Sequence, residues 1–186
     1  MITLPDIKAG AIVADPPLAF ETWSPKGEGR SPQHHYACES FERLATIPMT
    51  RAAAKNCFLF LWIPLRSVFV AEPLMRAWGF KFSGAAFAWV KQNPSGVGWF
   101  MGCGHGTRHN VEVCWLGRRG APQRKSARVR ELIIAPVRQH SRKPDEIYQR
   151  VEELADGPYL ELFARQEWPG WTCVGDEVGK FQRVAS

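Results

Sequence analysis

Short apolar runs separated by polar and turn-forming residues follow one another along most of the chain. Runs of this length, bounded by Gly, Pro and charged residues, predict strands that are buried in a sheet. Continuous apolar runs are more typical of strands covered on both faces than of strands with one face in water. The predicted strands cover residues 11–14, 57–62, 81–91, 111–116, 132–134 and 159–163.

Helical patterns lie between several of these strands. Ser40 is a suitable N-cap for a short helix, and residues 65–78 predict a longer helix with a kink at Pro73. Pro144 suits the first turn of another helix that runs to about residue 154. Strands that alternate with helices, without an internal repeat, predict a three-layer α/β fold with a mostly parallel sheet.

Two long segments are rich in glycine, proline and polar residues. Residues 19–36 and 93–107 are predicted to be exposed loops, and loops of this length are usually functional or mobile. The second loop contains Gly102, Gly104 and Gly106 at alternate positions. Because no strand-to-helix unit surrounds them, they do not predict a dinucleotide-binding loop.

Length and composition narrow the class of protein. A chain of 186 residues suits one domain, so we expect a single domain over 1–186. The longest apolar run covers residues 57–65, about half of a membrane span, and the first residues do not resemble an export signal. We therefore expect a cytoplasmic protein that does not cross a membrane. The five cysteines and five histidines lack metal-ligand spacing, which predicts no metal site.

Much of the net charge of +6 comes from one segment. Such a segment can follow a nucleic-acid backbone, and it can equally be a solvated loop. The candidate nucleic-acid-binding residues are Arg118, Arg119, Arg124, Lys125, Arg128 and Arg130.

An acid and two prolines end the first predicted strand. Asp15 directly follows residues 11–14, at the end of a strand where open α/β sheets bind ligands. Pro16 and Pro17 have no N–H, so this turn offers carbonyl oxygens that only accept hydrogen bonds. An acid beside such carbonyls suits an amino group, although a turn with a capping Asp has the same pattern.

Four separated signatures together resemble one enzyme family. They are Ala14-Asp15-Pro16-Pro17, Asn110-Val111-Glu112, His140-Ser141-Arg142-Lys143-Pro144-Asp145-Glu146, and Glu161-Leu162-Phe163-Ala164-Arg165 followed by Pro169-Gly170-Trp171. In this order they resemble the MT-A70 family of N6-adenine methyltransferases, and most of all its compact bacterial and phage members. The likeness covers nearly everything from Ile12 to Val178.

The resemblance implies a Rossmann-like fold, S-adenosylmethionine as the methyl donor, and a permuted order in which the catalytic motif precedes the cofactor strand. It implies that Asp15 and the Pro16 and Pro17 carbonyls hold the adenine amine. The residues expected near the cofactor are Asp15, Lys143, Glu161, Arg165, Asp176 and Glu177. Asp15 could instead cap the turn, and Lys143 and Arg165 could be surface ion-pair partners. Asp176 and Glu177 could open a C-terminal helix turn. A buried Glu161 needs a partner or a ligand.

The catalytic motif departs from the family at Leu18, where relatives usually carry an aromatic residue. An aromatic ring there can stack on the base, a contact worth roughly 1–3 kcal/mol. Trp23, Tyr36 and Trp99 lie in the two predicted loops and are candidates to replace that stacking, although packing against the sheet is the alternative.

Two functions remain open at this stage. The first is an active methyltransferase that methylates adenine in nucleic acid, with DNA favoured over RNA by the compact length. The second is a catalytically degenerate methyltransferase fold that binds nucleic acid or serves as a partner subunit, as Leu18 suggests. Either a homodimer or a heteromeric assembly is compatible with the sequence.

Overall fold

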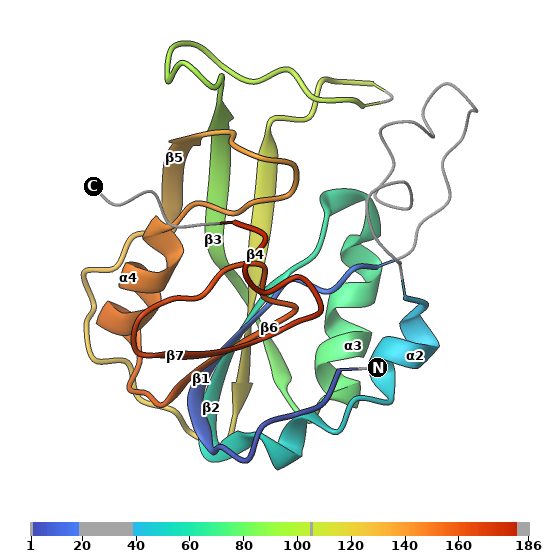
Figure 1. Ribbon diagram of the computed structural model, residues 1–186, viewed down its shortest axis with the longest axis vertical. Helices are drawn as coiled ribbons and strands as arrows, with labels where there is room; N and C mark the ends of the chain where they lie inside the picture. The colour runs from blue at the N-terminus through green and yellow to red at the C-terminus, as the bar shows by residue number, and fades with distance from the viewer. Residues whose placement is uncertain (1, 19–38, 105, 182–186) are drawn as a thin grey trace.

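The computed structural model describes residues 2–18, 39–104 and 106–181 (Figure 1). The seven strands belong to one sheet with the order β5-β3-β4-β2-β1-β6-β7. The strands are β1 (Ala9–Ala14), β2 (Ala53–Trp62), β3 (Lys81–Gln92), β4 (Val111–Arg119), β5 (Leu132–Pro136), β6 (Tyr159–Leu162) and β7 (Trp171–Val174).

The sheet is mixed, whereas the sequence predicted a mostly parallel one. β1 runs parallel to β2 and β6, and the outer pairs β3–β5 and β6–β7 are also parallel. β4 is antiparallel to both β2 and β3. The amino end of β4 therefore lies beside the carboxyl ends of β1, β2 and β6. We call this side of the sheet the Asp15 edge and the other side the opposite edge.

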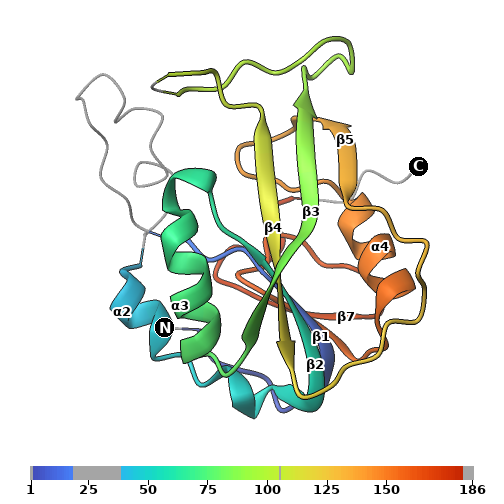
Figure 2. The ribbon, with the colours of Figure 1, turned by 180° about the vertical axis from the view of Figure 1, so that it is seen from behind.

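Helices cover both faces of the sheet, which gives the expected three layers (Figures 1 and 2). Because side chains alternate along a strand, Leu59 and Leu61 point to the face covered by α2 (Phe41–Ala45) and α3 (Ala71–Ala77). Phe58 and Phe60 point to the face covered by α4 (Glu146–Leu154). None of the helices in the described ranges is long and apolar enough to cross a membrane.

The predicted helix over residues 65–78 is divided in two. A 3-10 helix, η3 (Leu65–Val70), precedes α3, and the irregular residue is Ser67, with φ −110° and ψ 19°. The expected kink at Pro73 is absent because Pro73 is the third residue of α3, where the backbone N–H has no acceptor within the helix. Gly79 ends the helix with φ 81°, as predicted.

The other helix ends agree with the sequence more closely. The Ser40 hydroxyl caps α2 by accepting a hydrogen bond from the Arg43 amide at 3.3 Å. A single 3-10 turn, η2 (Met49–Arg51), leads into β2. α4 begins at Glu146, two residues after Pro144.

The strands differ from the prediction in several places, and β2 begins at Ala53 rather than at residue 57. β7 was not predicted, because a run of four partly buried residues is too short to be recognised by its pattern. β4 continues three residues past Leu116, because Arg118 and Arg119 pair with Phe58 and Cys57 of β2. The predicted loop over residues 19–36, with its stacking candidates Trp23 and Tyr36, lies outside the described residues.

Trp78 provides a test of the packing between α2 and α3. Its fully buried indole Nε1 donates a 2.8 Å hydrogen bond to the Leu44 carbonyl. We expect Trp78→Phe to lower the free energy of unfolding by about 2 kcal/mol, because one buried hydrogen bond is lost and the smaller ring leaves a cavity. Urea denaturation measures the loss. The matched control is Trp99→Phe at a side chain that is 57% exposed, and an equal loss in both variants would contradict the assignment.

Candidate active site

Strand pairing brings the two predicted acids of the site together. β1 and β6 are adjacent, with Val13 beside Glu161, so Asp15 follows β1 at the same edge where Glu161 ends β6. Ala14 lies beside Leu61 on the other neighbour, β2. Segments almost 150 residues apart in the sequence therefore meet at the Asp15 edge.

Lys143 lies between two carboxylates at this edge. Its Nζ is 2.7 Å from Asp15 Oδ2 and 3.5 Å from Glu112 Oε2. The same ammonium lies 5.5 Å from the centre of the Trp62 ring. Burial alone would lower the pKa of Lys143, but Asp15 and Glu112 more than offset that effect and raise it. Lys143 is therefore a permanent cation that bridges the motif on β1 to its own loop.

Glu112 extends this contact to a chain of four alternating charges, which are Asp15, Lys143, Glu112 and Lys91. Its Oε1 is 2.5 Å from Lys91 Nζ, while Oε2 faces Lys143. Burial would raise the pKa of Glu112, yet Lys143 and Lys91 hold it below its usual range. No role was predicted for Lys91, and Glu112 was named only as part of a family motif. The available signal was an acid immediately before the apolar run of β4, where an unpaired charge would be costly.

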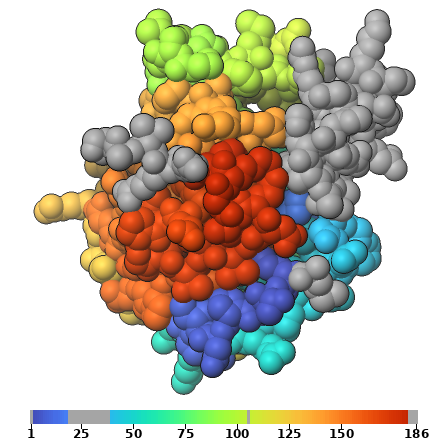
Figure 3. All heavy atoms as spheres, in the orientation of Figure 1, coloured from blue at the N-terminus to red at the C-terminus, as the bar shows by residue number. Residues whose placement is uncertain are grey.

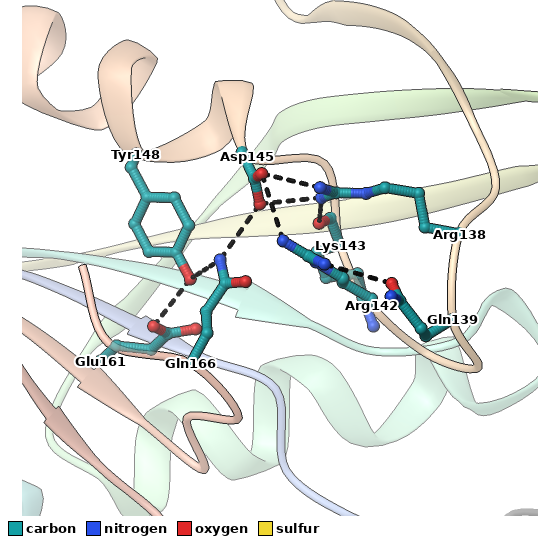
Figure 4. A network of polar contacts seen from close by, with 8 residues as sticks. All are labelled: Arg138, Gln139, Arg142, Lys143, Asp145, Tyr148, Glu161 and Gln166. Carbon is teal, nitrogen blue, oxygen red and sulfur yellow. Dashed lines mark hydrogen bonds and ion pairs between the residues drawn. The ribbon is translucent and has the colours of Figure 1, made fainter. Parts of the chain in front are cut away.

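A second polar network holds Glu161 on the side that faces α4 (Figure 4). The Tyr148 hydroxyl on α4 donates to Glu161 Oε2 at 2.8 Å, and Gln166 Nε2 lies 3.2 Å from that hydroxyl. The same Gln166 nitrogen donates to Asp145 Oδ1 at 3.1 Å. Burial raises the pKa of the Glu161 carboxyl to about 7, and the nearby Asp15 carboxylate acts in the same direction.

The loop that carries Lys143 is fixed by an arginine pair around Asp145. Arg138 donates to both Asp145 oxygens, at 2.7 and 2.8 Å, and to the Lys143 carbonyl at 2.7 Å. Arg142 Nη2 is 3.4 Å from Asp145 Oδ2. Burial opposes ionisation of Asp145, but hydrogen bonds from Arg138 and Gln166 keep its pKa below the usual range.

Two residues in the site loops adopt a backbone conformation that is unusual outside glycine. Ser141 has φ 62° and Phe163 has φ 63°, and they are the non-glycine residues with positive φ in the described ranges. Ser141 lies two residues before Lys143, and Phe163 two residues before Arg165. Such strain costs on the order of 1 kcal/mol at each residue and clusters at ligand-binding sites.

Arg165 links the end of β6 to the predicted ribose-binding pair. Its Nε is 3.2 Å from Glu177 Oε2, and its Nη1 donates to the His140 carbonyl at 3.4 Å. Asp176 is exposed beside Glu177 in the turn that follows β7. The residues after β6 lie across the face of the molecule shown in Figure 3. The structure thus brings Asp15, Lys143 and Glu161 to one edge and pairs Arg165 with Glu177, and Asp176 is the exposed chain neighbour of Glu177.

The prolines and Leu18 are engaged within the chain. The Pro16 carbonyl accepts from the Leu18 amide at 2.8 Å, and the Pro17 carbonyl accepts from the Glu39 amide at 2.7 Å. Each carbonyl keeps a second lone pair for a ligand. The Leu18 side chain is 6% exposed and packs in the core beneath α2 and α3. It does not occupy the place of a ring that stacks on a base.

The predicted nucleic-acid-binding segment lies away from this site. Arg118 and Arg119 end β4 at the opposite edge of the sheet, paired with Phe58 and Cys57. The chain then passes the carboxyl end of α4, where the Lys125 amide donates to the Leu154 carbonyl at 2.8 Å. The structure therefore does not bring this segment to Asp15.

The sequence of the chain resembles those of known proteins. The sequence profile described as MT-A70 matches residues 10–177, which include every site residue named above. The chain belongs to the MT-A70 family. The resemblance found in the four sequence motifs is thereby confirmed.

The relatives in this family carry methyltransferase names. The chain is 35% identical over 189 residues to "N(6)-adenine-specific methyltransferase METTL4" of Homo sapiens, which covers 93% of the chain and 38% of that protein. It is 30% identical over 176 residues to "N(6)-adenosine-methyltransferase catalytic subunit METTL3" of Homo sapiens, covering 92% and 28%. A Medicago truncatula protein, "Putative N(6)-adenosine-methyltransferase MT-A70-like", is 30% identical over 181 residues, covering 95% and 28%. The chain therefore spans well under half of the length of these relatives.

The raised pKa of Glu161 predicts a pH dependence of stability. A carboxyl with a pKa of about 7 when folded and about 4.5 when unfolded retains its proton longer in the folded state. Its contribution to the free energy of unfolding therefore falls as the pH rises from about 4.5 to 7 and is constant above that range. Urea denaturation of the wild type and Glu161→Gln from pH 4 to pH 8 isolates this contribution. A difference between the two proteins that is independent of pH would contradict the assignment.

Proposed function

We propose that this protein is an S-adenosylmethionine-dependent methyltransferase that transfers a methyl group to N6 of adenine in nucleic acid. The observation that carries the proposal is the 2.7 Å contact between Lys143 and Asp15, which joins two family motifs 128 residues apart into one charged site. The fold in this proposal is a Rossmann-like methyltransferase in which the catalytic strand β1 precedes the cofactor strand β6. DNA is the first substrate to test, and RNA the second.

The residues at the Asp15 edge suit S-adenosylmethionine chemically. Its ribose hydroxyls and ammonium group are donors, and Glu161, Asp176 and Glu177 offer carboxylate acceptors. Its carboxylate needs a cation, and Lys143 and Arg165 lie at the same edge. When bound, this cofactor supplies an electrophilic methyl group on a sulfonium with its own leaving group. These residues would hold it beside Asp15.

Asp15 would orient the amine. Lys143 contacts Oδ2, which leaves Oδ1 of the same carboxylate to accept an N–H bond from the base. The second lone pairs of the Pro16 and Pro17 carbonyls can accept the other N–H bond. Two acceptors on one amino group aim the nitrogen lone pair away from them, and holding two reactants in line lowers the barrier by proximity.

The proton of the amine leaves after the new N–C bond has formed. Asp15 is the acceptor placed at the nitrogen, whereas Lys143 carries a full set of protons because its pKa is raised. Glu112 shares the Lys143 ammonium with Asp15, and Lys91 balances Glu112. The role of these two residues is to position Lys143. An adenine reaches this edge only as an unpaired or flipped base.

Replacing the carboxylate tests the proposal directly. With labelled S-adenosylmethionine and adenine-containing DNA or RNA, we expect the wild type to form N6-methyladenine and Asp15→Ala to form none. Asp15→Asn retains an acceptor but loses the charge, and we expect kcat to fall about 100-fold. Asp6→Asn, at an exposed carboxylate, is the matched control. Equal label with wild type and Asp15→Ala would refute the role of Asp15.

A binding module without turnover is the alternative function, because Leu18 is buried where relatives carry an aromatic ring. Calorimetry separates the two functions. We expect S-adenosylmethionine to bind the wild type, and Glu161→Ala to weaken its binding by about tenfold as one charged hydrogen bond is lost. Nucleic-acid binding without any heat from S-adenosylmethionine or its demethylated product would support the binding module.

A further inference from the structure

The positive charge of the molecule is concentrated at the opposite edge of the sheet. Here β1, β2 and β3 begin and β4 ends, so residues from five separate parts of the chain come together. In Figure 2 this is the lower end of the sheet, where the arrow of β4 ends. We call it the basic edge, and its residues are Lys8, Arg51, Lys55, Lys81, Arg118, Arg119, Arg124 and Lys125.

Strand pairing and loop contacts place these residues side by side. Lys81 is the direct strand neighbour of Arg118. Gly120 packs closely against the Lys55 backbone, and the next residue, Ala121, donates to the Asn56 side chain at 3.0 Å. Lys8 Nζ donates to the Arg51 carbonyl at 2.5 Å. Four of the eight residues lie outside the basic segment of the sequence and join it only through the fold.

The charges of the basic edge are mostly not neutralised. Arg118 bonds to the Ser83 hydroxyl at 2.9 Å and Arg119 to the Gly79 carbonyl at 3.5 Å, and both of these acceptors are uncharged. Within residues 2–18, 39–104 and 106–181, the one ion pair made by the eight is Lys125 with Asp156, at 3.6 Å. The acids of the same edge are Asp6, Glu152, Glu153 and Asp156, so eight cations against four acids leave an excess of four.

The Asp15 edge shows the contrasting arrangement. Most of its cations in the described ranges are paired with carboxylates of the site, whereas Arg108, in the loop before β4, is exposed. The ion pairs there are Lys91–Glu112, Lys143–Asp15, Arg138–Asp145, Arg142–Asp145, Arg165–Glu177 and Lys180–Glu177. The excess of unpaired cations is therefore larger at the basic edge than at the edge that would receive the base.

We infer that the basic edge is a second nucleic-acid contact surface, which binds phosphates of a stretch remote from the base that reaches Asp15. Arg118 follows Glu112 by six residue steps along β4, which is roughly 20 Å at about 3.4 Å per residue. That distance corresponds to about six base pairs of duplex. A long nucleic acid can contact both edges, whereas a tetranucleotide in the site cannot. The claim that a base of the same nucleic acid reaches Asp15 rests on the proposed function. The claim that the basic edge binds phosphates does not depend on it.

Charge reversal at two exposed residues tests the surface. The exposed side chains of Lys55 and Arg124 make no hydrogen bond or ion pair with another described residue. Lys55→Glu/Arg124→Glu therefore reverses charge without removing a side-chain contact. The control with the same net charge is Arg43→Glu/Arg108→Glu, at exposed residues of α2 and of the loop between β3 and β4; it gives up one surface ion pair, Arg43 Nε to Glu39 Oε2 at 2.9 Å, and urea denaturation checks that it remains folded. Fluorescence anisotropy measures binding of an adenine-free DNA duplex of about 30 base pairs, and of an RNA strand of the same length.

We expect Lys55→Glu/Arg124→Glu to weaken binding about tenfold and to reduce the slope of log K against log salt by about 2, while the control changes both much less. The nucleic acid, DNA or RNA, whose affinity falls more in the edge variant is the one that the basic edge binds. Equal weakening by the two variants would overturn the inference, because it would reflect net charge alone.

A methylation assay separates this inference from the proposed function. The edge variant should methylate an adenine-containing tetranucleotide as the wild type does, and lose about tenfold in kcat/KM on the long substrate. Loss on both substrates would show that the edge does not act through a remote stretch. If the wild type methylates nothing but the binding difference is present, the proposed function fails and the contact surface stands.

Discussion

The ammonium of Lys143 between Asp15 and Glu112 is the interaction on which the site depends. A buried charge is tolerated only when it is paired, and these three residues come from a strand end, a strand start and a loop that are distant in the sequence. The requirement to satisfy all three charges determines how closely β1, β4 and the Lys143 loop approach one another. The site is therefore also a structural joint of the fold.

A second polar network supports this joint from the face covered by α4. Tyr148 and Gln166 connect Glu161 to Asp145, and Asp145 is in turn held by Arg138. Glu161 thus has a fixed position and a pKa of about 7, whereas Glu112 is fully ionised beside two cations. Two glutamates at one edge differ in how readily they ionise because their neighbours differ.

The antiparallel strand β4 divides the molecule into two chemically different ends. Its amino end delivers Glu112 to the balanced cluster around Asp15, and its carboxyl end delivers Arg118 and Arg119 to the basic edge. A strand that was parallel to β2 would have exchanged these positions. The mixed topology therefore separates the paired charges around Asp15 from the cations of the basic edge.

The sequence by itself determined the three-layer α/β class, most strands, the Ser40 cap and the family, because apolar periodicity, cap chemistry and motifs are local properties. It also predicted a role for Asp15 from its place at a strand end, and for Lys143, Glu161 and Arg165 from the family motifs in which they stand. Only the tertiary structure decided the direction of β4, the partnership of Lys91 with Glu112, the burial of Leu18 and the position of the basic segment. Those features depend on pairing between residues far apart in the chain, and no local pattern records which strands become neighbours.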